Sequence, residues 1–335
     1  MPTCLIVPES MREVPERYVD VLREAGFEIA YPKNPELARN LGGEAELIDE
    51  LQGISATIAG SEGYTPSVLG ASPQLRVIAR AGVGYDGVNV PAATEHAIPV
   101  TITPTANHEA VAEMTLALMF AACRMIVSND KQVRVGNWPR RLPLATRGKT
   151  IGIFGLGRIG SSLAYRAHAL GMHVLATEKF PNPEFVRAHK IELVELNQLL
   201  AQSDVISIHA PLTDETRGLF NAKAFASMKP GSIFLNTARG GLMVEADLYQ
   251  ALKSGHLHSA GLDVFEQEPP SADNPLFQLD NLVVSPHIAG ADETSLVAMG
   301  VEAAECIAAL YRSSWPEGAV VNDTLKGSFR WERGA

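Results

Sequence analysis

Cysteine is scarce in this sequence, and the few that occur are widely separated. Among 335 residues there are only Cys4, Cys123 and Cys306, each in an apolar stretch. A disulfide framework or a cysteine metal site needs closely spaced pairs, so this spacing argues against both. We therefore expect three reduced, buried thiols, a cytoplasmic location and no metal site.

Basic residues are in deficit as well. Lysine and arginine number 28 against 38 aspartate and glutamate residues, which gives a formal net charge of −10. A nucleic-acid-binding surface needs clustered positive charge. No nucleic-acid partner is therefore expected.

Long uninterrupted hydrophobic runs are also lacking. The most apolar helical stretch, residues 110–127, is interrupted by Glu113 and Arg124, whereas a transmembrane helix needs about 20 apolar residues. Residues 1–7 are too short for a secretory signal, lack its basic start and resemble a β-strand. We expect no membrane partner, and the ordinary balance of 46% hydrophobic and 20% charged residues is typical of a globular chain.

A glycine-rich turn between a strand and a helix is the most informative feature present. Residues 150–160 read T-I-G-I-F-G-L-G-R-I-G, and an alanine-rich amphipathic stretch continues to about residue 170. In a dinucleotide-binding fold the first glycine makes the turn, the second lets a pyrophosphate approach and the third allows helix–strand packing. Without a strand before it and a helix after it, the motif would indicate only a glycine-rich turn. The predicted cofactor-binding residues here are Gly155, Leu156, Gly157, Arg158, Ile159 and Gly160.

An acidic residue follows at the distance that such a motif requires. The apolar run at 172–177 ends at Glu178, about 20 residues after the glycines, where a carboxylate can bind the adenosine ribose hydroxyls. A carboxylate there repels the 2′-phosphate of NADP, so NAD is the expected cofactor. Lys179 could pair with that phosphate, although a solvated surface lysine is the simpler interpretation.

The chain shows two successive sets of alternating strands and helices, which predict two parallel sheets. The first set of strands is expected at residues 3–7, 28–31, 56–59, 77–79 and 99–101. The second is expected at residues 151–154, 173–177, 205–209, 232–236, 259–262 and 282–284.

The helices suggest how these sets form domains. A long helix near 107–127 joins them, and the helical run 291–310 comes too late for the second sheet and is expected to return to the first. The expected fold is α/β with two Rossmann-like parallel-sheet domains: a dinucleotide-binding domain at residues 102–288, and a discontinuous flavodoxin-like domain at residues 1–101 plus 289–335. Residues 328–335 are expected to be a loose end.

Three polar segments follow predicted strands of the second sheet. They contain Arg239, Glu268 and His287. Ligands bind outside the carboxyl ends of such strands, so these side chains are expected in one cleft. An arginine can bind a carboxylate with two hydrogen bonds, and a carboxylate beside a histidine favours the protonated imidazole needed for acid–base work. Taken singly, each segment could also be a surface arginine, a turn acid or a helix-start histidine.

Together these segments resemble the D-isomer-specific 2-hydroxyacid dehydrogenase family, in particular its phosphoglycerate-dehydrogenase-like branch. The resemblance extends over about residues 56–322. Its matching pieces are Arg80-Ala-Gly-Val-Gly-Tyr-Asp86, Asn107-His-Glu-Ala-Val-Ala-Glu113, Gly155 to Gly160, His209-Ala-Pro-Leu-Thr213, Met228-Lys-Pro-Gly231, Asn236 to Gly241, Gly261-Leu-Asp-Val-Phe265 with Glu268-Pro, and Ser285-Pro-His287.

The resemblance implies roles for individual residues. Arg239 would bind the substrate carboxylate, His287 would act as general acid/base, and Glu268 would support the histidine. The discontinuous domain would be the substrate domain, in which the backbone at Val83 and Gly84 cradles the carboxylate. Ser61 and Asn107 complete the expected substrate site.

Further cofactor contacts are implied by the same resemblance. Asp263, Thr237 and Ala238 would lie with Arg239 and His287 at the nicotinamide end, His209, Ala210 and Pro211 would lie beside the adenosine end, and Gly290 is a further expected cofactor-binding residue. His209 could equally serve only to pin its loop.

The activity implied is NAD-dependent interconversion of a D-2-hydroxy acid and its 2-oxo acid. Relatives that act on phosphorylated substrates often carry a basic side chain in the loop that here contains Glu62, which argues against phosphoglycerate. Arg80, Arg140 and Arg141 could still contact a phosphate. The formate-oxidising branch has glutamine where this chain has Glu268.

A non-enzymatic, NAD-sensing partner-binding protein of the same fold remains an alternative, because such relatives keep the catalytic residues. A homodimer is expected, because the helix near 107–127 is too apolar to face water. The stretch 136–141 resembles an arm that reaches a neighbouring subunit in relatives.

Overall fold

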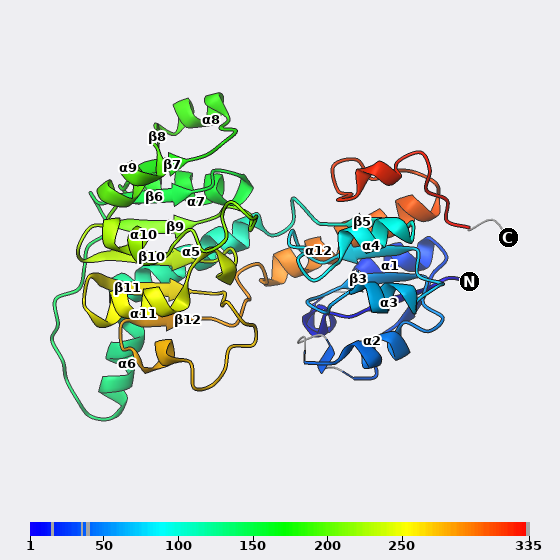
Figure 1. The fold of residues 1–335 in the computed structure, drawn as a ribbon, viewed down its shortest axis with the longest axis horizontal. Coiled ribbons are helices and arrows are strands. Elements are labelled where there is room, and N and C mark those ends of the chain that lie inside the picture. Colours follow the sequence, from blue (N-terminus) through cyan, green and yellow to red (C-terminus); the bar gives the residue numbers. More distant parts are fainter. Residues whose placement is uncertain (15–16, 35, 38–40, 333–335) are drawn as a thin grey trace. The chain divides into compact units, whose positions relative to one another are not determined.

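Two parallel sheets organise the chain in the computed structural model, which describes residues 1–14, 17–34, 36–37 and 41–332 (Figure 1). The sheets belong to two separate units, Met1–Asn107 with Ala291–Ala335 and His108–Gly290. We call these the first and the second unit. The sequence placed the changes of domain after residues 101 and 288, whereas the structure has them after Asn107 and Gly290.

The sheet of the first unit has five parallel strands in the order β2-β1-β3-β4-β5. This order is doubly wound, because the chain adds β2 on one side of β1 and then β3, β4 and β5 on the other. The bounds of the strands are β1 Thr3–Ile6, β2 Glu28–Ala30, β3 Ala56–Ala59, β4 Val77–Arg80 and β5 Val100–Thr101. All five were predicted from the sequence to within a residue or two.

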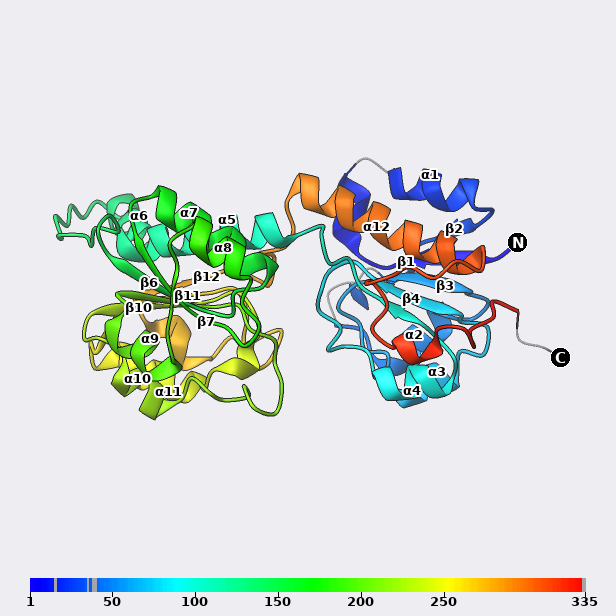
Figure 2. The same ribbon diagram turned by 90° about the horizontal axis from the view of Figure 1, so that it is seen from above.

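Helices cover both faces of this sheet (Figure 2). One face packs against α1 (Arg17–Glu24) and α12 (Glu293–Tyr311), in a core that contains Tyr18, Leu22 and Ile307. The other face is covered by α2 (Glu44–Glu50), α3 (Pro66–Gly70) and α4 (Val90–Glu95). Because α12 packs on this sheet, the C-terminal run returns to the first unit as the sequence predicts.

Helix α12 is long and apolar enough to cross a membrane by length and composition, as is the bent pair α5 and α6 taken together. Core helices of globular proteins pass the same test. In α12 the apolar residues Ala303, Ala304 and Ile307 are fully buried against the sheet, and this burial accounts for its composition.

The sheet of the second unit has seven parallel strands in the order β12-β11-β10-β9-β6-β7-β8. Their bounds are β6 Thr150–Phe154, β7 His173–Thr177, β8 Glu192–Leu193, β9 Val205–Ile208, β10 Ser232–Asn236, β11 Leu257–Leu262 and β12 Leu282–Val284. The sequence did not predict β8, whose two residues are exposed at the sheet edge and carry no hydrophobic pattern.

Alternate residues of these strands enter two different cores. Ile151 and Ile153 of β6 pack with α5 (His108–Cys123) and α7 (Arg158–Ala169), whereas Phe154 packs on the opposite face. That opposite face is covered by α9 (Leu196–Gln202), α10 (Ala222–Ser227) and α11 (Glu245–Lys253), and Figure 2 shows the two helical layers. The short helix α8 (Pro183–Ala188) lies between β7 and β8.

The helix predicted near 107–127 is broken in two. Helix α5 ends at Cys123, Met125 has a left-handed backbone with φ of 51°, and α6 (Ile126–Arg134) leaves at an angle of 57°. A left-handed residue cannot continue a right-handed helix, so the break follows from the backbone at Met125. Apolar periodicity continued through this break, which is why the sequence did not show it.

The expectation of a loose C-terminus is wrong for residues 328–332. Phe329 and Trp331 pack against the core of the first unit, and the Trp331 ring makes edge contacts with Phe27 and Tyr311. Arg76 Nε also donates to the Trp331 carbonyl at 3.0 Å. Residues 333–335 lie outside the described part of the chain.

Candidate active site

The glycine-rich turn after β6 leaves space where a cofactor phosphate would lie. Gly155 has φ of 97°, and a Cβ there would come within 2.7 Å of the Ala210 nitrogen. A Cβ on Gly160 would come within 2.0 Å of the Gly155 carbonyl oxygen. At Gly157, in contrast, a Cβ would meet nothing within 4 Å. The first and third glycines are thus needed for close packing, and the second faces open space.

The start of α7 has the donors that an anion requires. Gly157 precedes the helix and has no side chain to cap it, so the first N–H groups of α7 do not donate to a capping side chain. Such N–H groups and the helix dipole together favour a phosphate. Arg158 is exposed at the first helical position, Ile159 is half-buried behind it, and Leu156 is buried in the core. These residues fit the pyrophosphate of a dinucleotide.

Glu178 folds back onto this turn. Its Oε2 accepts a hydrogen bond from the Leu156 N–H at 2.7 Å, and its Oε1 accepts one from the Phe180 N–H at 2.9 Å. Each carboxylate oxygen can accept more than one hydrogen bond, so both retain capacity for ribose hydroxyls. Lys179 is paired with Glu215 at 2.5 Å, which agrees with the simpler interpretation of a surface lysine.

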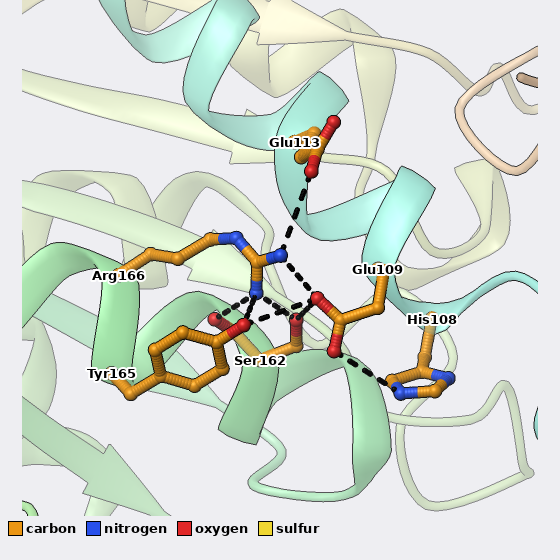
Figure 3. Close-up of polar contacts among 6 residues, drawn as sticks. All are labelled: His108, Glu109, Glu113, Ser162, Tyr165 and Arg166. Carbon is orange, nitrogen blue, oxygen red and sulfur yellow. Dashed lines mark hydrogen bonds and ion pairs between the residues drawn. The ribbon is translucent and has the colours of Figure 1, made fainter.

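A polar cluster joins α7 to α5 (Figure 3). Arg166 binds Glu109 and lies 3.5 Å from Glu113. Ser162 and Tyr165 also donate to Glu109, at 3.0 and 3.1 Å. Burial favours a raised pKa for Glu109, but its hydrogen bonds with Arg166, Ser162 and Tyr165 and the Arg166 charge outweigh burial and lower the pKa. The cluster braces the helix whose N-terminus is the predicted phosphate site.

Arg239 lies in a loop that is braced from the end of β10. The fully buried Asn236 donates from Nδ2 to the Arg239 carbonyl at 2.8 Å and accepts from the Ala238 N–H at 3.0 Å. Arg239 itself is half-buried, and its guanidinium donates to the Ala238 carbonyl at 2.6 Å. Thr237 shares a hydrogen bond of 2.9 Å with Thr115 of α5. These hydrogen bonds hold the backbone from Asn236 to Arg239.

His287 and Glu268 form a direct pair. The Nδ1 atom of His287 lies 2.5 Å from Oε2 of Glu268, while Oε1 accepts from the Phe265 N–H at 2.9 Å. Burial by itself raises the pKa of Glu268, but the bond and charge of His287, the Phe265 N–H and the charge of Arg239 outweigh it and lower the pKa. The charges of all three predicted catalytic residues thus act on one another, and among the described residues Nε2 of His287 has no hydrogen-bond partner.

Asp263 holds the histidine loop in place. Its Oδ1 accepts from the Ser285 hydroxyl at 2.5 Å and from the Ile288 N–H at 3.0 Å, and its Oδ2 accepts from the Ala289 N–H at 2.8 Å. The Asp263 carbonyl accepts from the His287 N–H at 2.8 Å. His287 has φ of 53°, a conformation that a non-glycine residue keeps only when its surroundings enforce it. The predicted contact of Asp263 with the cofactor stays a prediction.

The sequence missed two residues that shape this site. Asn236 and Ser285 were seen only as parts of motifs: Asn236 bonds to the turn that follows it, whereas Ser285 bonds to Asp263, 22 residues earlier in the chain. A signal was available, since asparagine at the end of a strand commonly hydrogen-bonds to the following turn. Gly290, predicted in the cofactor site, ends the second unit.

His209 is a neutral, locally bound residue. Its Nε2 lies 2.7 Å from the Ser207 hydroxyl, and its Nδ1 is buried without a hydrogen-bond partner in the described part of the chain. Burial lowers the pKa of His209 to about 3. The neighbouring Ala210 packs against Gly155, and the Pro211 carbonyl accepts from Thr216. The loop is thus fixed beside the glycine turn, and its cofactor contacts stay a prediction.

The predicted substrate residues belong to the first unit. Ser61 is exposed, Val83 and Gly84 are half-buried, and Asn107 is buried with its Oδ1 lacking a hydrogen-bond partner among the described residues. Glu62 is only 2% exposed, so its carboxylate points into the protein rather than toward solvent.

The cysteines lie as the sequence predicts. Cys4, Cys123 and Cys306 are all free and buried. Among the described residues there is no group of three histidine, cysteine, aspartate or glutamate side chains that could hold a metal ion.

Known proteins resemble this chain in sequence and in fold. A family model for the D-isomer specific 2-hydroxyacid dehydrogenase, NAD binding domain, matches residues 116–289. A D-3-phosphoglycerate dehydrogenase from Archaeoglobus fulgidus is 41% identical over 297 residues, which are 88% of this chain but 55% of that protein. This chain thus spans about half the length of the phosphoglycerate dehydrogenases that it matches.

Two other proteins match over nearly their full length. A glyoxylate reductase from Korarchaeum cryptofilum is 35% identical over 94% of this chain and 96% of its own. The crystal structure of the TT0316 protein from Thermus thermophilus superposes with a TM-score of 0.84 at 36% identity, and covers 95% of this chain and 99% of that one.

Proposed function

This chain belongs to the D-isomer-specific 2-hydroxyacid dehydrogenase family, and on that premise we propose that it interconverts a D-2-hydroxy acid and its 2-oxo acid with NAD as cofactor. The main support is the His287–Glu268 pair at 2.5 Å, which lies in the same unit as a glycine turn suited to a dinucleotide. A proton donor, a carboxylate that favours its charged form and a nearby arginine are the groups that carbonyl reduction needs.

Each of these groups has a proposed part in the reaction. The cofactor, when bound, supplies or accepts the hydride. In reduction, protonated His287 donates from Nε2 to the carbonyl oxygen of the 2-oxo acid, because its Nδ1 is engaged by Glu268. Arg239 binds the substrate carboxylate and stabilises negative charge that grows on the reacting oxygen. In oxidation neutral His287 takes the proton back.

The substrate carboxylate is proposed to bind the backbone at Val83 and Gly84, with Ser61 and Asn107 as further substrate contacts. The loop after β3 carries the acid Glu62 and no base, and the charge of Arg80 acts on the buried Glu62 carboxylate. We therefore favour an unphosphorylated 2-oxo acid. Arg140 and Arg141 are the cations that would have to serve a phosphorylated substrate.

The test is an assay of NADH oxidation with a panel of 2-oxo acids, which includes glyoxylate, pyruvate and 3-phosphohydroxypyruvate. We expect turnover with at least one of the unphosphorylated acids, and greater kcat/KM for it than for the phosphorylated acid. Tight NADH binding without turnover of any panel member would contradict the proposal and support an NAD-sensing protein instead.

A further inference from the structure

A buried carboxylate lies beneath the loop that is proposed to bind the substrate carboxylate. Strands β3 and β4 are parallel neighbours, with Ala59 opposite Arg80 at their carboxyl ends. The loop 60–65 follows β3 and the loop 81–89 follows β4, so both loops leave the same edge of the sheet. Glu62 lies in the first loop, and Val83 and Gly84 lie in the second.

Glu62 is bound by several groups within its own loop and strand. Its two oxygens lie 3.1 and 2.9 Å from the Gly60 nitrogen, and its Oε1 accepts from the Tyr64 hydroxyl at 2.9 Å. The Tyr64 hydroxyl also lies 3.1 Å from the Thr57 hydroxyl. Since Tyr64 has one hydroxyl proton, donation to Glu62 leaves Thr57 to donate to Tyr64. This is a closed network of fully buried side chains.

The second loop is tied to the first through its backbone. The Tyr64 N–H donates to the Gly87 carbonyl at 2.7 Å, and the Asn89 N–H donates to the Tyr64 carbonyl at 3.0 Å. A Cβ on Gly87 would lie 3.0 Å from the Glu62 carbonyl oxygen. The two loops are therefore in direct contact, and a shift of residues 62–64 would be transmitted to residues 84–89.

Arg80 connects the buried carboxylate to the cradle itself. Its Nε donates to the Gly84 carbonyl at 2.8 Å, which fixes the orientation of the peptide that follows Gly84. Burial raises the pKa of Glu62, and the charge of the Arg80 guanidinium opposes that rise. Arg80 thus acts electrostatically on the Glu62 carboxylate and, through its Nε, holds the Gly84 carbonyl.

We propose that Glu62 is a positioning residue: with Tyr64 it orients Arg80 and the 84–89 loop, and so holds the backbone of Val83 and Gly84 in the shape that binds the substrate carboxylate. This inference rests on the proposed function, because the carboxylate cradle is part of it. Glu62 is fully enclosed and does not itself contact substrate.

The test compares steady-state kinetics of wild type with Glu62→Gln, Arg80→Lys and the double variant, using NADH and the best 2-oxo acid. Glutamine keeps the size of the side chain but removes the charge that faces Arg80. We expect KM for the 2-oxo acid to rise about 10- to 100-fold, because small misplacements of a binding group have effects of that size. The kcat should change less than about threefold, since Arg239, Glu268 and His287 are intact, and the NADH dissociation constant should not change.

The second readout is whether the effects of Glu62→Gln and Arg80→Lys on KM add in the double variant. If both substitutions act through the Gly84 carbonyl, the double variant should raise KM little more than the stronger single variant. Glu50→Gln is the matched control, because Glu50 also accepts a backbone N–H, from Lys33 at 2.7 Å, in the same unit but at the end of α2, outside the 60–65 and 81–89 loops. Its KM should equal that of wild type.

The outcomes separate this inference from the proposed function. If Glu62→Gln has the same kcat and the same KM as the wild-type enzyme, the inference is overturned. This holds even if the melting temperature of the variant falls, because Glu62 would then be only structural. Absence of wild-type turnover overturns the proposed function and this inference with it. If Glu62→Gln does not fold, Arg80→Lys and Tyr64→Phe take over the test, and unchanged KM in both overturns the inference.

Discussion

From the contact between His287 and Glu268 we predict how the rates of reduction and oxidation depend on pH. The hydrogen bond and charge of His287 help to lower the pKa of Glu268, so Glu268 keeps its negative charge beside the imidazole. Reduction needs the protonated imidazole and should fall as pH rises through its inflection. Oxidation needs the neutral imidazole and should rise through the same range.

Glu268→Gln should move both inflections to lower pH, because it removes the negative charge and keeps a hydrogen-bonding shape. The measurement is the pH profile of kcat/KM in each direction. Profiles that coincide for wild type and variant would remove Glu268 from the mechanism, and an active His287→Ala enzyme would remove the histidine as well.

Arg239 is expected to act through the geometry of its guanidinium and not through charge alone. Arg239→Lys keeps the charge but loses the planar pair of donors. We expect kcat/KM for the 2-oxo acid to fall by about 10²–10³-fold, the usual effect of losing an oriented contact to the reacting group. The NADH dissociation constant, measured by fluorescence, should barely change. Near-wild-type turnover would show that another residue holds the carboxylate.

Glu178 is expected to set the preference for NADH over NADPH. Its carboxylate accepts the Leu156 N–H at the phosphate turn, so the 2′-phosphate of NADPH would approach an anion held rigidly in place. Glu178→Ala should narrow the ratio of kcat/KM values for the two cofactors. Glu178→Gln separates the effect of the charge from the effect of the hydrogen bond, since glutamine keeps an acceptor for the Leu156 N–H without the charge. A wild-type enzyme that prefers NADPH would refute the assignment.

At the scale of elements, two loops of the second unit meet at Gly240. A Cβ there would lie 1.8 Å from the Phe265 carbonyl oxygen and 2.5 Å from the Glu266 nitrogen. Gly240 begins the short 3₁₀ helix Gly240–Leu242, directly after Arg239, and Phe265 donates its N–H to Glu268. This close approach brings the arginine loop and the glutamate loop together.

Gly240→Ala should therefore separate the two loops. We expect a loss of stability of about 1–3 kcal/mol from overpacking and a larger loss of kcat/KM than of cofactor binding. Thermal unfolding and steady-state kinetics measure these effects. The control is Gly70→Ala, since a Cβ on Gly70 at the end of α3 meets nothing within 4 Å. Equal activity of the two variants would show that the contact at Gly240 does not position Arg239.

The strands and helices also differ in how well the sequence predicts them. Most strands were predictable because most of their residues are apolar on both faces, as in Ala56–Ala59 and Val205–Ile208, where every residue is buried. Strand β8 has exposed residues and therefore no such pattern. The break at Met125 depends on one backbone angle, and the packing of Trp331 depends on contacts with Phe27, which lies near the opposite end of the chain.

The proximity of Glu268 and His287 was predictable for related reasons. Arg239, Glu268 and His287 each follow a strand of one sheet, and strand ends converge. The buried position of Glu62 could not be read from a loop of glycine, serine and tyrosine, because it depends on Thr57 and Arg80 in two neighbouring strands. Likewise, the bracing of the His287 loop by Asp263 requires the left-handed backbone at His287.

At the scale of the whole molecule, the apolar residues of α5 do not by themselves require a partner. Leu118 and Met119 are buried in the core of the second unit, and Met114, Leu116 and Phe120 pack against it. Exposed apolar side chains occur instead in α6 and the segment after it. They are Ile126, Val127, Val133, Val135, Trp138 and Leu142, and Leu142 is 92% exposed.

We expect this surface, residues 126–142, to be covered by a second copy of the chain, because exposed apolar side chains clustered within one segment mark interfaces. Light scattering at micromolar concentration should then give twice the chain mass of 35.9 kDa. Trp138→Glu combined with Leu142→Glu should shift the protein toward the monomer, because a charge buried in an apolar interface is costly.

Phe180→Glu is the matched control: Phe180 is 88% exposed but lies outside this segment, so its substitution should leave the mass unchanged. A wild-type mass equal to one chain at these concentrations would refute the dimer. A doubled mass that persists in the Trp138 and Leu142 variant would place the interface on another surface.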